Sequence, residues 1–88
     1  MPLDVKKAVE LARASLADIL LVPVSKLLLE EVELTDDHQF WLITFSYPSP
    51  PDSAIQTMLG SIRAYKVVKL HAETGEFISI KIRSLAAA

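Results

Sequence analysis

The stretch FWLITFSY, residues 40–47, decides the fold of this 88-residue chain. Aromatic and β-branched residues favour strands, and side chains two positions apart in a strand lie on the same face. Trp41, Ile43, Phe45 and Tyr47 therefore share one face. We expect this to be the core face of a sheet, where it meets a helix.

A weaker alternating segment precedes this stretch, at residues 27–35. One of its faces would carry Leu28, Val32 and Leu34, with Glu30 among them. Its other face would carry Leu29, Glu31, Glu33 and Thr35. The residues that follow, DDH at 36–38, have turn chemistry. Residues 27–35 and 39–47 are therefore predicted to form a β-hairpin.

A second hairpin is predicted from residues 62–71 and 76–84. The connection ETGE contains Gly75, which supplies the positive φ that a tight turn with a bulge requires. In the last segment Ile78, Ile80 and Ile82 alternate with polar residues. This pattern is typical of a half-buried strand, with the three isoleucines facing the core.

The N-terminal region has a helical period instead. At 100° per residue its apolar residues form a stripe roughly 120° wide. The stripe consists of Ala8, Val9, Ala12, Leu16, Ile19 and Leu20. Asp4 is placed to cap the first turn, and Pro23 disfavours helical geometry at Val22. A helix over residues 3–21 is predicted.

Proline punctuates the middle of the chain, where residues 48–61 are predicted to be a flexible loop. Within it, residues 54–59 would form either one helical turn or a mobile flap, and residues 85–88 would be a tail. The sequence thus predicts a single domain over residues 1–88. Its class would be α+β, with one amphipathic helix packed on a four-stranded antiparallel sheet made of two hairpins.

Composition argues against several kinds of chemistry. Without cysteine the chain has no disulfide, thiolate metal site or cysteine nucleophile, and two glycines do not make a phosphate cradle. No serine, histidine and acid have diagnostic spacing, so we expect no enzyme activity and no cofactor. Asp36, Asp37 and His38 are adjacent in a turn, whereas metal ligands must converge. His71 would meet His38 only if the ends of the two hairpins share an edge of the sheet.

Charge is unevenly distributed around a net value of -2. Residues 1–52 carry a net charge of -5 and residues 53–88 a net charge of +3. This polarity favours association with a protein partner or with another copy, whereas nucleic-acid binding usually needs an overall basic domain. The N-terminus lacks the pattern of a signal peptide, and no apolar run is long enough to span a membrane, so a cytoplasmic location is expected.

Two groups of residues are candidates for contact with a partner. The first is acidic and lies in the first hairpin: Glu31, Glu33, Asp36 and Asp37. The second is apolar and lies in the proline-rich loop: Ile55, Met58 and Leu59. The loop residues would either pack on the core or form a binding flap. A basic group, Lys66, Lys69, Lys81 and Arg83, is interpreted as solvated or edge-protecting.

The tryptophan-containing strand FWLITF at 40–45 and the closing hairpin AYKVVKLHAETGEF at 64–77 resemble PepSY and PepSY-like domains. The layout is also similar to that of a family of small bacterial immunity proteins. The resemblance covers roughly residues 5–84 and implies a cystatin-like or PepSY-like fold. It also implies a non-catalytic binding or inhibitory role, with no residue motif for inhibition.

These observations lead to two hypotheses. The first is a small non-catalytic protein-interaction module, an immunity-like or PepSY-like inhibitor of a bacterial partner protein. The alternative is a homo-oligomeric structural or regulatory protein with no enzyme target, for which a homodimer is the simplest form.

Overall fold

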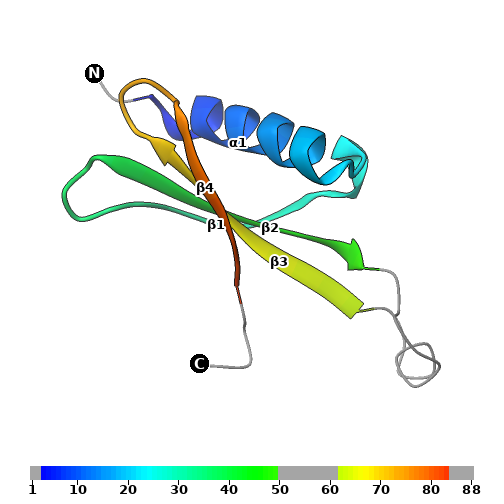
Figure 1. The fold of residues 1–88 in the computed structure, drawn as a ribbon. Coiled ribbons are helices and arrows are strands. Elements are labelled where there is room, and N and C mark those ends of the chain that lie inside the picture. Colours follow the sequence, from blue (N-terminus) through cyan, green and yellow to red (C-terminus); the bar gives the residue numbers. More distant parts are fainter. Residues whose placement is uncertain (1–2, 50–61, 84–88) are drawn as a thin grey trace.

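A computed structural model describes residues 3–49 and 62–83 of the chain (Figure 1). Its elements are α1 (Val5–Leu20), the short 3-10 helix η1 (Val24–Lys26), β1 (Leu28–Leu34), β2 (Phe40–Ser49), β3 (Ile62–His71) and β4 (Phe77–Ile82). The strands form one antiparallel sheet in the order β1-β2-β3-β4, and α1 lies along one side of it. The predicted α+β layout is confirmed.

A side-chain cap and a left-handed residue account for the two ends of helix α1. The Asp4 side chain accepts a hydrogen bond from the backbone N–H of Lys7 at 2.8 Å, which satisfies one of the free donors of the first turn. At the other end Leu21 adopts a left-handed conformation with φ of 56°, and the chain turns away ahead of Pro23. The helix therefore spans Val5–Leu20.

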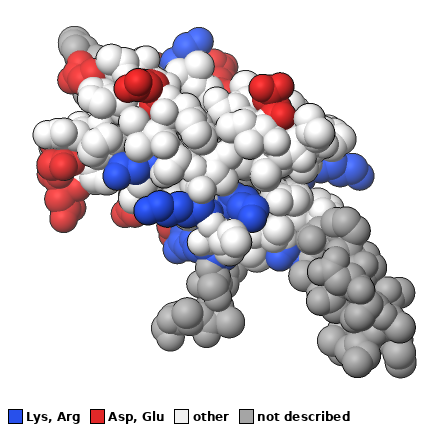
Figure 2. All heavy atoms as spheres, in the orientation of Figure 1, with Lys and Arg blue, Asp and Glu red and all other residues white. Residues whose placement is uncertain are grey.

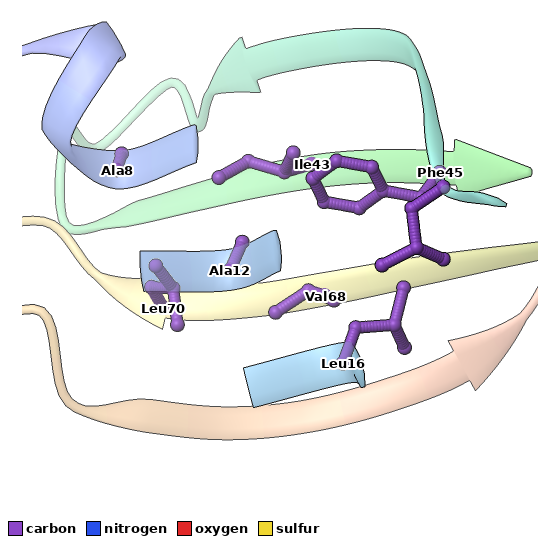
Figure 3. Close-up of a cluster of buried hydrophobic side chains, with 8 residues drawn as sticks. Ala8, Ala12, Leu16, Ile43, Phe45, Val68 and Leu70 are labelled. Atoms are coloured by element: carbon purple, nitrogen blue, oxygen red, sulfur yellow. The ribbon is translucent and has the colours of Figure 1, made fainter. Parts of the chain in front are cut away.

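The core lies between α1 and the two central strands (Figure 3). The helix contributes Ala8, Ala12 and Leu16, and the strands contribute Ile43, Phe45, Val68 and Leu70, all fully buried. Two of the three buried helical side chains are alanines, which let the helix come close to the sheet. Trp41 and Tyr47 are partly buried and pack against this cluster, so the predicted core face of β2 is right.

The predicted face of β1 is wrong for its first half. The register with β2 shifts between Leu29 and Glu31, so that Leu29 lies opposite Phe45 and Val32 lies opposite Ile43. Leu29 and Val32 therefore share the helix side, and Leu28 is on the other side, 53% exposed. A single extra residue, Glu30, causes this change, because one inserted residue reverses which face every earlier side chain occupies.

Of the three isoleucines of β4 predicted to face the core, only Ile80 packs on it. Ile80 lies opposite Val68 and packs on the core. A second register shift leaves Ile78 without a partner between Ser79 and Phe77, and Ile78 is 42% exposed. Ile82 is 79% exposed at the end of an edge strand, beyond the reach of the helix.

Strand β2 continues through Pro48 and Ser49, which the sequence placed in the loop. Pro48 pairs with Arg63 of β3, whereas β1 reaches only as far as the residue opposite Ser46. The side of Pro48 that lacks an N–H therefore has no strand beside it in the described part of the chain, and proline is tolerated in a strand at such a position. Residues 50–61, including Ile55, Met58 and Leu59, and the tail 85–88 lie outside the described residues.

The turn between β3 and β4 contains Gly75 with φ of 76°, as predicted. The backbone N–H of Gly75 donates to the carbonyl of His71 at 2.8 Å. A β-carbon at this position would lie 2.7 Å from Leu11 Cδ1 and 3.0 Å from Leu3 Cδ1. Glycine is therefore required here by both the backbone angle and the packing of the turn against α1.

Candidate interaction surface

The side of the sheet opposite α1 carries no second layer among residues 3–49 and 62–83 (Figure 1). We call it the bare face. It is hollowed into a trough of about 640 Å³. The lining consists of Glu31, Glu33, Leu42, Thr44, Val67, Lys69, Ser79, Lys81, Ile82 and Arg83. Leu42, Val67 and Lys69 come from the central strands, and the other charged residues lie toward the two edges.

The two edges of the bare face have opposite charge. Glu31 and Glu33 come from β1 at one edge, and Lys81 comes from β4 at the other. Figure 2 shows Lys and Arg gathered below the helix, where β4 crosses the sheet, and Asp and Glu both at the turn of the β1–β2 hairpin and along the top of the molecule. The charge polarity of the sequence thus becomes a polarity across one surface.

Arg83 connects the two edges. Its Nη1 forms an ion pair with the Glu31 carboxylate and donates to Thr44 Oγ1 at 3.0 Å. The hydrogen bond with Glu31 raises the pKa of Arg83 above its ordinary value. Because β1 and β4 are the outermost strands, this contact requires the sheet to curl toward the bare face. The bare face is therefore concave.

A polar network lies beside the trough, centred on the buried hydroxyl of Ser46. The fully buried Ser46 hydroxyl donates to Glu30 Oε2 at 2.5 Å and accepts from Arg63 Nε and Nη2 at 3.1 and 3.0 Å. The bulge at Glu30 turns this carboxylate toward Ser46. Sequence reasoning missed the network, although Thr44 and Ser46, two hydroxyl residues in an otherwise apolar strand, were the signal for it.

The acidic residues predicted as a binding group do not form one site. Glu31 and Glu33 line the trough, whereas Asp36 and Asp37 belong to the turn after β1. Asp37 Oδ1 accepts from Thr35 Oγ1 at 2.6 Å and from the Gln39 N–H at 3.0 Å. These hydrogen bonds, the one from Thr35 first, lower the pKa of Asp37. Asp37 therefore holds the turn together.

His71 and Lys69 both contact the ring of Phe40. His71 packs edge-on against Phe40, with ring centroids 5.8 Å apart, and its Nδ1 accepts from the Glu73 N–H at 3.2 Å. Lys69 lies over the Phe40 ring at 4.2 Å from the centroid. Within the described ranges no three His, Asp or Glu side chains are grouped so that they could hold a metal ion.

A second, apolar groove of about 490 Å³ runs between α1 and the β1 side of the sheet. Its lining consists of Val5, Lys6, Val9, Glu10, Arg13, Ala14, Val24 and Leu29. Arg13 closes one part of it by donating to the Leu27 carbonyl at 2.8 Å and by stacking over Phe45 at 5.1 Å from the ring centroid. Val24, which precedes edge strand β1, and Leu29, which belongs to it, remain exposed.

No protein-family model matches the chain, and the comparisons with curated proteins and with solved structures found no match. No helix in the described ranges has the length and hydropathy needed to cross a bilayer. The bare face offers a concave surface with apolar residues between opposite charges, which suits recognition of another surface.

Proposed function

We propose that this chain is a non-catalytic protein-interaction module that acts through the bare side of its sheet. The observation that carries the proposal is the asymmetry of the sheet. One side is closed by α1 over a fully buried core, and the other is a concave face with unlike charges at its edges. Protein interfaces commonly combine an apolar centre with a polar, charge-complementary rim.

An antiparallel sheet can also simply face water on one side. Two features of the sheet favour binding over simple solvation. Leu42 and Val67 place apolar side chains in the trough of the bare face, and both edge strands expose large apolar residues. The exposed residues on the edge strands are Leu28, Leu29, Phe77, Ile78 and Ile82, of which Leu29, Phe77 and Ile82 lie on the helix side of the sheet. Unpaired edge strands are sites where another chain can pair.

The specific form of the proposal is an inhibitor of a bacterial partner protein, acting in the cytoplasm. It follows the resemblance of the tryptophan strand and closing hairpin to PepSY-like domains and immunity proteins. The acidic edge formed by Glu31 and Glu33 would face a basic surface of such a partner. Because acidic and basic side chains are mixed on the bare face, a protein surface suits it better than a nucleic acid does.

A second candidate function is that of a homo-oligomeric structural or regulatory protein. The opposite charges of the two edges favour it, since a surface that carries both signs is complementary to a second copy of itself. In this case the chain has no enzyme target.

Affinity capture from native lysate tests the proposal. The wild type is compared with Glu33→Lys on the bare face and with Asp18→Lys, a matched charge reversal on the exposed side of α1. We expect one stoichiometric protein, either a different protein or untagged copies of the chain, to be retained by the wild type and Asp18→Lys and lost with Glu33→Lys. Retention that is equal for all three proteins, or recovery of nucleic acid in place of protein, would contradict the proposal.

A further inference from the structure

The two edge strands of the sheet, β1 and β4, have no further strand beside them in the described part of the chain. An unpaired edge presents free N–H and C=O groups to any strand that can match its spacing. In both strands a regular stretch follows a bulge: residues 31–35 in β1 and residues 79–83 at the end of β4. These two stretches are where a further strand would bind.

The hydrogen-bond pattern shows which backbone groups of β1 are free. The Thr35 N–H donates to the Phe40 carbonyl at 2.9 Å, so this pair is hydrogen bonded within the hairpin. Bonding alternates along an antiparallel pair, so the backbone groups of Glu33 and Glu31 also face β2. The free groups of β1 therefore belong to Val32 and Leu34. Both side chains lie on the helix side of the sheet, opposite Ile43 and Trp41.

The backbone groups of β4 that face away from β3 can be identified in the same way. The Arg83 N–H donates to the Tyr65 carbonyl at 3.0 Å, so Arg83 and Lys81 direct their backbone groups toward β3. The free groups belong to Ile80 and Ile82. Ile80 packs on the core side. Ile82 lies opposite Lys66, which lies opposite Phe45, so alternation places Ile82 on the same side, and at the end of the strand it also borders the trough.

The free groups of β1 and β4 thus belong to residues on the same face of the sheet. Because hydrogen-bonded partners share a face, this match places the helices of both copies on the same side of the joined sheet. With Val32 opposite Ile82 and Leu34 opposite Ile80, the bare face would carry Glu33 opposite Lys81 and Glu31 opposite Arg83. Apolar residues meet on one side and opposite charges meet on the other.

From this match we infer that β1 pairs with β4 of a second copy of the chain, in a closed twofold dimer. The dimer contains this pairing of β1 with β4 twice, and we call each of the two paired edges a seam. This inference rests on the second candidate function, the homo-oligomeric protein, and deepens it by naming the interface. A dimer closed in this way encloses both bare faces, so it stands in place of the inhibitor form of the proposal. A twofold axis along the strands, on the bare side, places β1 of each copy beside β4 of the other. It also sets the acidic edge of each bare face against the basic edge of the second copy.

Strand direction agrees with this arrangement. In a four-stranded antiparallel sheet the first and last strands run in opposite directions. An axis along the strands leaves those directions unchanged, so β1 and β4 of the second copy are antiparallel, as the pairing requires. A twofold axis perpendicular to the strands would instead place β1 of one copy against β1 of the other. The acidic residues of the two copies would then face each other.

Curvature agrees as well. The contact between Arg83 and Glu31 across the bare face shows that the sheet already curls toward that side. Two such sheets would close into eight antiparallel strands with the helices outside. A barrel of eight strands has an interior that side chains can fill, and closure leaves no free edge. The interior would be lined by both bare faces, so the charged side chains there would be enclosed and would have to pair, Glu33 with Lys81 and Glu31 with Arg83. In this dimer the Glu31 carboxylate of one copy can form its ion pair with Arg83 of the second copy in place of Arg83 of its own chain.

Disulfide trapping tests the seam directly, because the chain contains no cysteine. Glu33 and Lys81 of the second copy would form a non-hydrogen-bonded pair with Cα atoms about 4.5 Å apart, within the range that a disulfide bridges. Within one chain the two positions lie three strand spacings apart across the sheet, about 14 Å, which is too far. Glu33→Cys and Lys81→Cys are therefore made as separate proteins and mixed under mild oxidation.

We expect the mixture to form the mixed disulfide at least tenfold faster than either variant alone, or than either variant mixed with Asp18→Cys. A chain carrying both Glu33→Cys and Lys81→Cys should stop at a covalent dimer, since two seams close the assembly. A ladder of larger products would overturn the closed twofold arrangement. Mixed cross-linking no faster than the Asp18→Cys control would overturn the pairing itself.

The capture experiment separates this inference from the proposed function. A monomer that fails to cross-link but retains a different protein through Glu33 would overturn the dimer and leave the interaction module standing. A chain that neither cross-links nor retains any protein would overturn both. Wild-type sedimentation at the concentrations used for trapping provides the oligomeric state for this comparison.

Discussion

Replacing Gly75 should destabilise the protein through two separable effects. The left-handed backbone at φ of 76° costs an L-residue about 1–2 kcal/mol. An added β-carbon would also lie 2.7 Å from Leu11 Cδ1, well inside the usual carbon contact distance, and such overpacking costs about 1–3 kcal/mol. Because Leu11 Cδ1 is the end of a flexible side chain, we expect the lower part of that range. Gly75→Ala should therefore cost about 2–3 kcal/mol.

Urea denaturation followed by circular dichroism measures this cost. A loss of about 2–3 kcal/mol lowers the midpoint by roughly 1–2 M at the m-values of small domains. Gly75→Asn adds the same β-carbon but tolerates the left-handed conformation, so it should cost about 1 kcal/mol less than Gly75→Ala. In a Leu11→Ala background the contact is removed, and the cost of Gly75→Ala should fall toward that of the backbone alone.

An unchanged midpoint for Gly75→Ala would show that the turn between β3 and β4 is not folded as described. A Gly75→Asn variant at least as unstable as Gly75→Ala would refute the separation into backbone and packing effects. The same would follow if the Leu11→Ala background left the cost of Gly75→Ala undiminished.

Three further outcomes are expected. Trp41→Ala should cost about 2–4 kcal/mol in chemical denaturation, because the ring packs on the core and its Nε1 donates to the backbone at 3.2 Å; a cost below 1 kcal/mol would contradict that packing. Ser46→Ala should lower the free energy of unfolding by about 1–2 kcal/mol, since the Ser46 hydroxyl accepts from Arg63 in a fully buried position; a neutral Ser46→Ala would show that the network does not contribute. Asp37 has a lowered pKa in the folded state, so its contribution is present above the unfolded pKa of about 3.9 and is lost as pH falls through the folded value. Asp37→Asn or Thr35→Ala should therefore flatten the loss of stability below about pH 4, and an unchanged acid titration would contradict this role.

Much of the fold followed from local patterns in the sequence. The period of the helical stripe located α1, and Pro23 located its end, because both effects act within a few residues. Alternation placed Ile43 and Phe45 in the core, and Gly75 marked a turn that needs a positive φ. These features depend on backbone geometry that neighbouring residues determine.

The errors arose where pairing with another strand decides the outcome. Glu30 and Ile78 are extra residues in their ladders, and each reverses the faces assigned to its neighbours. Nothing local distinguishes a bulge residue from a paired one, because the bulge exists only relative to the partner strand. Pro48 was misplaced for the same reason, since proline is accepted in β2 only because β1 ends before reaching it.

The candidate site could be predicted only in part. Glu31 and Glu33 were identified as contact residues from their charge, and both line the trough. Asp37 was grouped with them, but its hydrogen bonds belong to the turn. The network around Ser46 depends on the bulge that turns Glu30 toward it, so no strand-by-strand pattern could reveal it.

Sedimentation equilibrium of a charge-exchange series tests the central claim, that the oppositely charged edges of the bare side pair between two copies of the chain. The series consists of the wild type, Glu33→Lys, Lys81→Glu and the doubly exchanged chain. The account predicts a wild-type dimer that weakens with salt, a roughly tenfold weaker dimer for each single reversal, and recovery to within about threefold of the wild type when both charges are exchanged. A wild type that stays monomeric up to millimolar protein, or a double exchange no tighter than the single reversals, would contradict it.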